Sequence, residues 1–174
     1  SAMPVMTTAG SGNIGLTASL PVITFCRERN KSDEQLYRAL FFSHLTTIHV
    51  KAKIGRLSAY CGPMCAAAAV AGAIGFVNDF DFQTISNAII NTLGGVSGIV
   101  CDGANSSCPI KIANGTYAAY DGIAMAANGN VITVGDGIVG QDVEQTINNI
   151  AEMAQKGMDV TDKVILDIMT RDDI

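Results

Sequence analysis

The chain carries little charge. Lys, Arg, Asp and Glu together make up 16% of its 174 residues, against roughly 25% in an average soluble domain. Such a composition indicates a chain that hides much of its surface against a partner, or one that is cut from a larger protein. The net charge is −5, whereas general nucleic-acid binders carry an excess of basic residues. We therefore expect no nucleic-acid partner.

A secretion signal is missing as well. No basic segment precedes an apolar stretch, so we expect a cytoplasmic protein without a signal peptide. Residues 1–3 look like an expression scar followed by a start methionine, and they are left out of the fold prediction. The odd number of cysteines, five, disfavours a disulfide scaffold and favours reduced thiols or a metal site. These cysteines are Cys26, Cys61, Cys65, Cys101 and Cys108.

Several catalytic patterns are absent, namely a Ser-His-Asp arrangement, a P-loop and a paired-carboxylate motif. Residues 10–15 do contain G-x-G-x-x-G, but too few residues precede it for a strand, and no parallel-sheet pattern follows. We prefer an anion nest, in which backbone N–H groups and the side chains of Ser11 and Asn13 hold a carboxylate at a helix N-terminus. His44 and His49 lie five apart, which does not suit a shared metal, so we expect surface or packed residues.

Residues 64–77 form a very apolar stretch. It is short of the roughly 20 strongly apolar residues that a membrane span needs, and alanine and glycine insert weakly. Four consecutive alanines followed by Gly72 and Gly75 instead predict a helix that packs closely against its neighbours. We expect no membrane association.

Hydrophobic spacing and end signals predict a mainly α fold, a helical bundle with glycine-rich loops. Ser32 or Asp33 caps one helix, Pro63 and Pro109 each open another, and Gly157 is a predicted C-cap. The first capped helix is indicated by Leu36, Leu40, Phe41, Leu45 and Ile48 at helical spacing. Residues 131–134 are predicted as one short strand or extended segment. The predicted helices lie near 16–26, 33–50, 63–77, 82–93, 109–123, 141–156 and 159–169, and residues 4–174 are expected to form a single domain.

The cysteine spacing leaves two interpretations open. Three residues separate Cys61 from Cys65, and six separate Cys101 from Cys108. The second pair spans a loop that ends at a helix start, where free N–H groups and the helix dipole stabilise thiolates. The spacing matches neither zinc ribbons nor common ferredoxins. Metal or cluster ligands and buried packing residues are therefore both compatible with spacing alone, and Cys26 and Cys65 suit packing.

Basic residues gather in the first third of the chain. One interpretation is a solvated face, in which each lysine or arginine is a surface charge; the other is an entrance for anionic substrates. Lys51, Lys53, Arg56 and Lys111 are the candidates to bind a substrate carboxylate or to act as a base. The cluster comprises Arg27, Arg29, Lys31, Arg38, Lys51, Lys53 and Arg56.

Three blocks of sequence, 4–17, 55–62 and 99–104, followed by Cys108 and Lys111, resemble successive blocks of the serine dehydratase α-chain-like family. The resemblance points to its L-cysteine desulfidase and YhaM-like branch. It implies an oxygen-sensitive [4Fe–4S] cluster held by Cys61, Cys101 and Cys108, with the fourth iron open to substrate. Ser11, Asn13 and Lys111 are the implied catalytic residues, with Ser11 and Asn13 holding the substrate.

The implied reaction is α,β-elimination from a small L-amino acid without pyridoxal phosphate. L-cysteine would give sulfide, pyruvate and ammonia, and L-serine would give pyruvate and ammonia. Full family enzymes carry an additional N-terminal portion, so we expect that portion or a second subunit as a partner, and a homodimer is a further expectation. The alternatives are a non-catalytic fragment that completes another chain's site, and a structural zinc domain.

Overall fold

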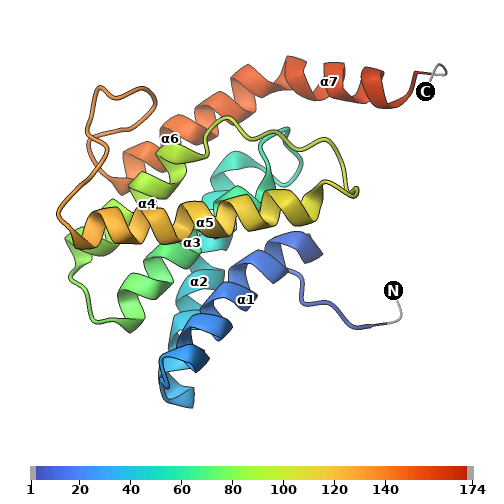
Figure 1. The fold of residues 1–174 in the computed structure, drawn as a ribbon. Coiled ribbons are helices and arrows are strands. Elements are labelled where there is room, and N and C mark those ends of the chain that lie inside the picture. The colour runs from blue at the N-terminus through green and yellow to red at the C-terminus, as the bar shows by residue number, and fades with distance from the viewer. Residues whose placement is uncertain (1–2, 172–174) are drawn as a thin grey trace.

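The computed structural model describes residues 3–171, and in that range the chain is mainly helical and contains no strand (Figure 1). The predicted mainly α fold is confirmed, whereas the first two residues of the predicted expression scar lie outside the described residues. The helices are α1 (Gly12–Glu28), α2 (Asp33–Ile54), α3 (Gly62–Val77), α4 (Phe82–Gly95), α5 (Cys108–Ala127), α6 (Val143–Glu152) and α7 (Met158–Met169).

The helix ends follow the local signals. Ser32 caps α2 through a capping box, in which the Gln35 N–H donates to the Ser32 hydroxyl and the Ser32 N–H donates to the Gln35 side chain. Asp81 caps α4 by accepting from the Thr84 N–H at 2.7 Å. Pro63 and Pro109 lie in the first turns of α3 and α5, as predicted.

Helix α3 forms the centre of the bundle and packs against α1, α2, α4 and α5 (Figure 1). Apart from Phe76, every residue of α3 is buried. A Cβ on Gly72 would lie 2.8 Å from the Phe42 ring and 3.0 Å from Ile89, so the close packing predicted for this stretch is confirmed. Among residues 3–171, no helix has the length and apolar character needed to cross a membrane.

Helix α2 buries a different face from the one its large apolar residues suggest. Phe41 is 68% exposed and Leu45 is 50% exposed. The buried face instead carries small or polar residues, and it is this face that packs against α3. Its members are Ala39, Ser43, Thr47, Val50, Lys51 and Ile54. Small side chains on this face let α2 approach the alanine-rich α3 closely.

The short strand predicted as one possibility for residues 131–134 does not form, because residues 131–133 lie in a loop and Val134 lies in a turn. The side chain of Asn91, on α4, makes hydrogen bonds to the backbone on both sides of Val131. The Asn91 amide donates to the Asn130 carbonyl oxygen at 3.0 Å, and its side-chain oxygen accepts from the Ile132 N–H at 2.8 Å. A buried asparagine thus replaces the ladder that would have made this segment a strand.

The predicted C-cap at Gly157 is wrong. A π-helical turn, Met153–Gly157, joins α6 directly to α7, so the helical path continues where a stop was expected. Gly157 has a φ of −82°, outside the left-handed region in which a C-cap glycine is needed. Helix α6 itself ends at Glu152, and Glu144 fastens it to α2 through Lys53 at 2.5 Å and His49 at 2.9 Å.

Candidate functional site

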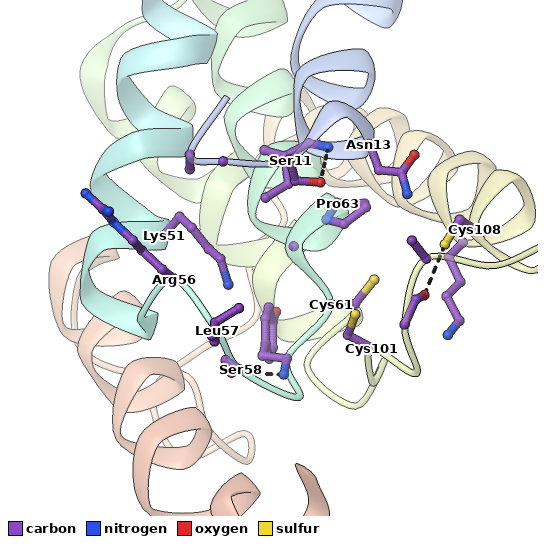
Figure 2. A pocket seen from close by; sticks show the side chains of 18 residues that line it. Ser11, Asn13, Lys51, Arg56, Leu57, Ser58, Cys61, Pro63, Cys101 and Cys108 are labelled. Carbon is purple, nitrogen blue, oxygen red and sulfur yellow. Dashed lines mark hydrogen bonds between the residues drawn. The ribbon is translucent and has the colours of Figure 1, made fainter. Parts of the chain in front are cut away.

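One cavity of about 240 Å³ brings together most of the site residues that the sequence predicts, whereas the candidate Lys53 lies outside it and pairs with Glu144. It lies among the first turns of α1, α3 and α5 and the loops that precede α3 and α5 (Figure 2). The predicted residues that line it are Ser11, Asn13, Cys61, Cys101, Cys108 and Lys111. Segments far apart in the sequence therefore meet at a single hollow.

Three helix N-termini face this cavity. Ser11 is the N-cap of α1, Cys61 is the N-cap of α3, and Cys108 is the first residue of α5. Each N-terminus leaves backbone N–H groups without helical acceptors and carries the positive end of the helix dipole. The cavity is therefore suited to an anion or to a thiolate-bound metal group.

Backbone pairing places Cys61 beside Cys101. The Cys61 N–H donates to the Ile99 carbonyl oxygen at 3.1 Å, and the Cys101 N–H donates to the Ala59 carbonyl oxygen at 2.6 Å. These bonds form a short antiparallel bridge between the two loops. Figure 2 shows both side chains directed into the same part of the cavity.

The loop 102–107 brings Cys108 to the same cavity. The Cys108 thiol donates to the Gly103 carbonyl oxygen at 3.5 Å and accepts from the Asn105 N–H at 3.5 Å. The Asn105 side chain closes the loop by donating to the Asp102 carbonyl oxygen. Gly103 has a φ of +94°, which an L side chain rarely adopts, so the turn requires glycine.

Lys111 lines the cavity but its ammonium group already has partners. It is paired with the Asp102 carboxylate and donates to the Val100 carbonyl oxygen at 3.0 Å. Burial lowers the pKa of Lys111, but the hydrogen bond and charge of Asp102 more than offset this, and the net shift is upward. Lys111 therefore ties the cysteine-bearing loop to α5.

The thiols differ in their ease of ionisation. Burial raises the pKa of Cys61 to about 11, and the neighbouring Cys101 adds to the effect. Burial likewise raises the pKa of Cys65 to about 12, while Lys51 opposes it. Cys26 and Cys65 lie in the core away from the cavity wall, in keeping with the packing roles expected of them. A metal that binds Cys61 must displace its proton.

The donor set of the cavity consists of thiols. Cys61, Cys101 and Cys108 line it, and thiolates are the ligands that iron–sulfur clusters take in proteins. Within residues 3–171, no three His, Cys, Asp or Glu side chains form a group that could hold a metal ion, and a structural zinc site would need four ligands around one ion.

Two further polar groups lie on the cavity wall. Lys51 was named as a candidate to bind a substrate carboxylate, with a solvated surface charge as the other interpretation, and it is only 4% exposed and lines the cavity. Tyr60 is fully buried, and its hydroxyl has no hydrogen-bond partner among residues 3–171. The signal for the burial of Lys51 is its position four residues after Thr47 and eight after Ser43, on the inward face of α2. Tyr60 was not predicted as a site residue, although it precedes Cys61 in block 55–62.

Comparison with known proteins finds one family model and several relatives of similar sequence. A family model described as Serine dehydratase alpha chain matches residues 1–167. A UPF0597 protein of Fusobacterium nucleatum is 56% identical over 98% of this chain and 40% of its own length. UPF0597 proteins of Treponema denticola and Desulfitobacterium hafniense are 47% and 46% identical, over 97% and 96% of this chain and 39% of their own lengths. The chain thus spans about two fifths of these curated relatives, and no solved structure matches it.

Proposed function

The chain belongs to the serine dehydratase alpha chain family, and on that premise we propose that it is the iron–sulfur part of a lyase for small L-amino acids. The observation that carries the proposal is the meeting of Cys61, Cys101 and Cys108 on one cavity at three helix N-termini. The substrate is L-cysteine or L-serine. A [4Fe–4S] cluster, when bound, supplies a Lewis-acidic iron that polarises the substrate's β-substituent.

The reaction is an α,β-elimination. The Cα–H and Cβ–S bonds of L-cysteine break, and the electron pair of the Cα–H bond forms the Cα–Cβ double bond. Sulfide leaves with the electron pair of the Cβ–S bond, and the proton released from Cα balances its charge. The aminoacrylate tautomerises to an imine, and water converts the imine to pyruvate and ammonia. With L-serine the same steps expel water in place of sulfide. No redox change occurs, so no external oxidant or reductant is needed.

The residues of the chain bind and orient the substrate. Asn13 and the hydroxyl of Ser11 face the cavity at the start of α1. Ser11 accepts from the Ile14 N–H at 3.4 Å, which leaves its own proton free to donate to a ligand. Lys111 acts as a positioning residue, because Asp102 and Val100 occupy its ammonium group.

We propose that the portion of the relatives that this chain does not cover completes the site. Leu57 is 95% exposed and lines the cavity. On α2, the exposed side chains of Tyr37, Phe41 and Leu45 line an apolar groove. Apolar area of this kind favours a covering partner. The N-terminal portion of the full enzyme is the proposed occupant, and a second copy of the chain is the competing one.

A chimera tests the activity. This chain replaces the matching two fifths of the Fusobacterium nucleatum relative, and the product is reconstituted with iron and sulfide without oxygen. We expect pyruvate from L-cysteine or L-serine, with sulfide equal to pyruvate in the first case. Cys101→Ala should abolish pyruvate formation and Cys65→Ala should retain it. No pyruvate from either amino acid, or full activity in Cys101→Ala, contradicts the proposal.

A further inference from the structure

Lys51 is a largely buried lysine whose ammonium group has no partner among residues 3–171. The residue lies on the face of α2 that packs against α3, and it is 4% exposed. Its ammonium group makes no hydrogen bond or ion pair with any residue in the part of the chain that the structure describes. The nitrogen is not among the fully buried polar atoms that lack a partner, so it reaches the cavity that Lys51 lines. A ligand anion in the cavity would pair with this charge.

Neighbouring groups do not supply the anion. Lys51 lowers the pKa of the Cys65 thiol, but burial has the larger effect and raises this pKa to about 12. The thiol is therefore neutral near neutral pH. The carboxylate of Asp102 is paired with Lys111. Arg56, the other cation on the α2 side of the cavity, is exposed to solvent. The cavity therefore contains one largely buried lysine whose charge has no partner among residues 3–171.

The direction of Lys51 links it to the site. Figure 2 shows Lys51 on one side of the cavity and Cys61, Cys101 and Cys108 on the opposite side. The fully buried Tyr60 also lines the wall, and its hydroxyl is a second donor without a partner. An α-amino acid carries its carboxylate and its β-substituent on different carbons, so the two groups can face opposite sides of the cavity.

We infer that Lys51 binds the carboxylate of the small L-amino acid and so turns the β-substituent toward the three cysteines. The inference rests on the proposed function for the identity of the ligand. It makes Lys51 the residue that distinguishes an amino acid from its amide or amine analogues, because charge-assisted hydrogen bonds to a carboxylate are stronger than those to a neutral amide. Lys51 is a binding residue, and no proton transfer is assigned to it.

Binding measured by calorimetry or NMR titration tests this without turnover. The probes are L-alanine, which has no β leaving group, and L-alaninamide, which has no carboxylate. The 174-residue chain should bind L-alanine saturably and at least about tenfold more tightly than L-alaninamide, tenfold being the usual scale of one charge-assisted contact. Lys51→Met should remove this preference.

Lys53→Met is the matched control. Lys53 lies on the same helix and carries the same charge, but it pairs with Glu144 outside the cavity. This variant should bind L-alanine as the parent chain does. Lys51→Arg, which keeps the charge, should retain part of the preference for L-alanine. Thermal unfolding checks that Lys51→Met is folded, and a Tm close to that of the parent is expected because the variant breaks no hydrogen bond or ion pair among residues 3–171.

Two results would overturn the inference: no saturable binding of L-alanine by the parent chain, or equal L-alanine affinity in the parent and in folded Lys51→Met. Iron and sulfide content, measured separately, keeps this test apart from the proposed function. If a cluster forms but Lys51→Met binds L-alanine normally, only the carboxylate subsite fails. If no cluster forms but binding depends on Lys51, the subsite stands and the lyase proposal fails.

Discussion

The Gly103 carbonyl oxygen accepts a hydrogen bond from the Cys108 thiol at 3.5 Å, and Gly103 itself has a φ of +94°. This turn aims Cys108 at the cavity, and glycine suits it for two reasons. The left-handed conformation is unfavourable for a residue with a Cβ, and that Cβ would lie 3.0 Å from the terminal methyl of Met169. The turn therefore connects the site with α7.

Gly103→Ala should lower the free energy of unfolding by about 1–2 kcal/mol and reduce the iron bound after reconstitution. Urea denaturation and iron analysis measure the two effects. Gly95→Ala is the matched control, because no atom lies within 4 Å of its Cβ position and its φ is not in the left-handed region. A Gly103→Ala protein as stable and as iron-rich as the control would show that the turn is not needed to place Cys108.

The contact between α2 and α6 should depend on pH. Hydrogen bonds from Lys53 and then His49 lower the pKa of Glu144. A carboxyl with a lowered pKa stabilises the fold above its unfolded pKa of about 4.3, and this contribution disappears as pH falls through the folded pKa. Because the Glu144 side chain is 49% exposed, solvent screening limits the effect to less than about 1 kcal/mol.

Glu144→Gln should therefore be slightly less stable than the parent at neutral pH, and the two should converge in acid. Urea denaturation of both proteins across the acid range measures the difference. A difference that is constant down to acid pH would mean that the substitution acts through packing and not through the charge of Glu144.

Tyr60→Phe should raise the stability of the chain without ligand. The Tyr60 hydroxyl is buried without a partner, and removing a desolvated, unsatisfied hydroxyl recovers about 1 kcal/mol or more. Thermal and urea unfolding measure this gain. Tyr117→Phe is the control, since Tyr117 is 69% exposed and should change stability by less than about 0.5 kcal/mol. A loss of stability in Tyr60→Phe would reveal a partner for the hydroxyl in the folded protein.

Alkylation should separate the core thiols from the cavity thiols. Iodoacetamide reacts with thiolates, and burial raises the pKa of Cys26 and of Cys65, the latter to about 12. In the folded, iron-free chain near neutral pH, Cys101 and Cys108, which are partly exposed, should be modified first. Mass spectrometry of digests gives the order, with urea-unfolded chain as the reference. Equal rates at Cys65 and Cys108 would contradict the arrangement.

Local chemistry predicted most of the helices, because capping and proline signals act within one turn. Ser32, Pro63 and Pro109 mark helix starts that the structure confirms. At residues 131–134 a distant residue decides the outcome, because Asn91 of α4 satisfies the backbone around Ile132 and no strand partner is needed there. The C-cap predicted at Gly157 failed because the chain stays helical there through a π-helical turn.

The candidate site likewise combines residues that the sequence indicates with contacts that only the fold creates. The cysteines were found through family blocks, whereas their meeting depends on the bridge between the loops at Tyr60 and Val100, which pattern analysis does not show. Lys51 was one of four basic candidates, and the sequence did not separate it from Lys53, because a lone lysine is usually solvated. The exposed Phe41 and Leu45 also suggested a different buried face for α2. Only the packing of α2 on α3 reveals that Lys51 is largely buried and lines the cavity.

The central claim is that Cys61, Cys101 and Cys108 together hold an iron–sulfur cluster. The most direct measurement is iron and sulfide content per chain after anaerobic reconstitution, for five cysteine-to-alanine variants. We predict that the parent, Cys26→Ala and Cys65→Ala approach the four irons of a [4Fe–4S] cluster, and that Cys61→Ala, Cys101→Ala and Cys108→Ala lose most of that iron. Full iron in the cavity variants, or an equal loss in all five, would contradict the account.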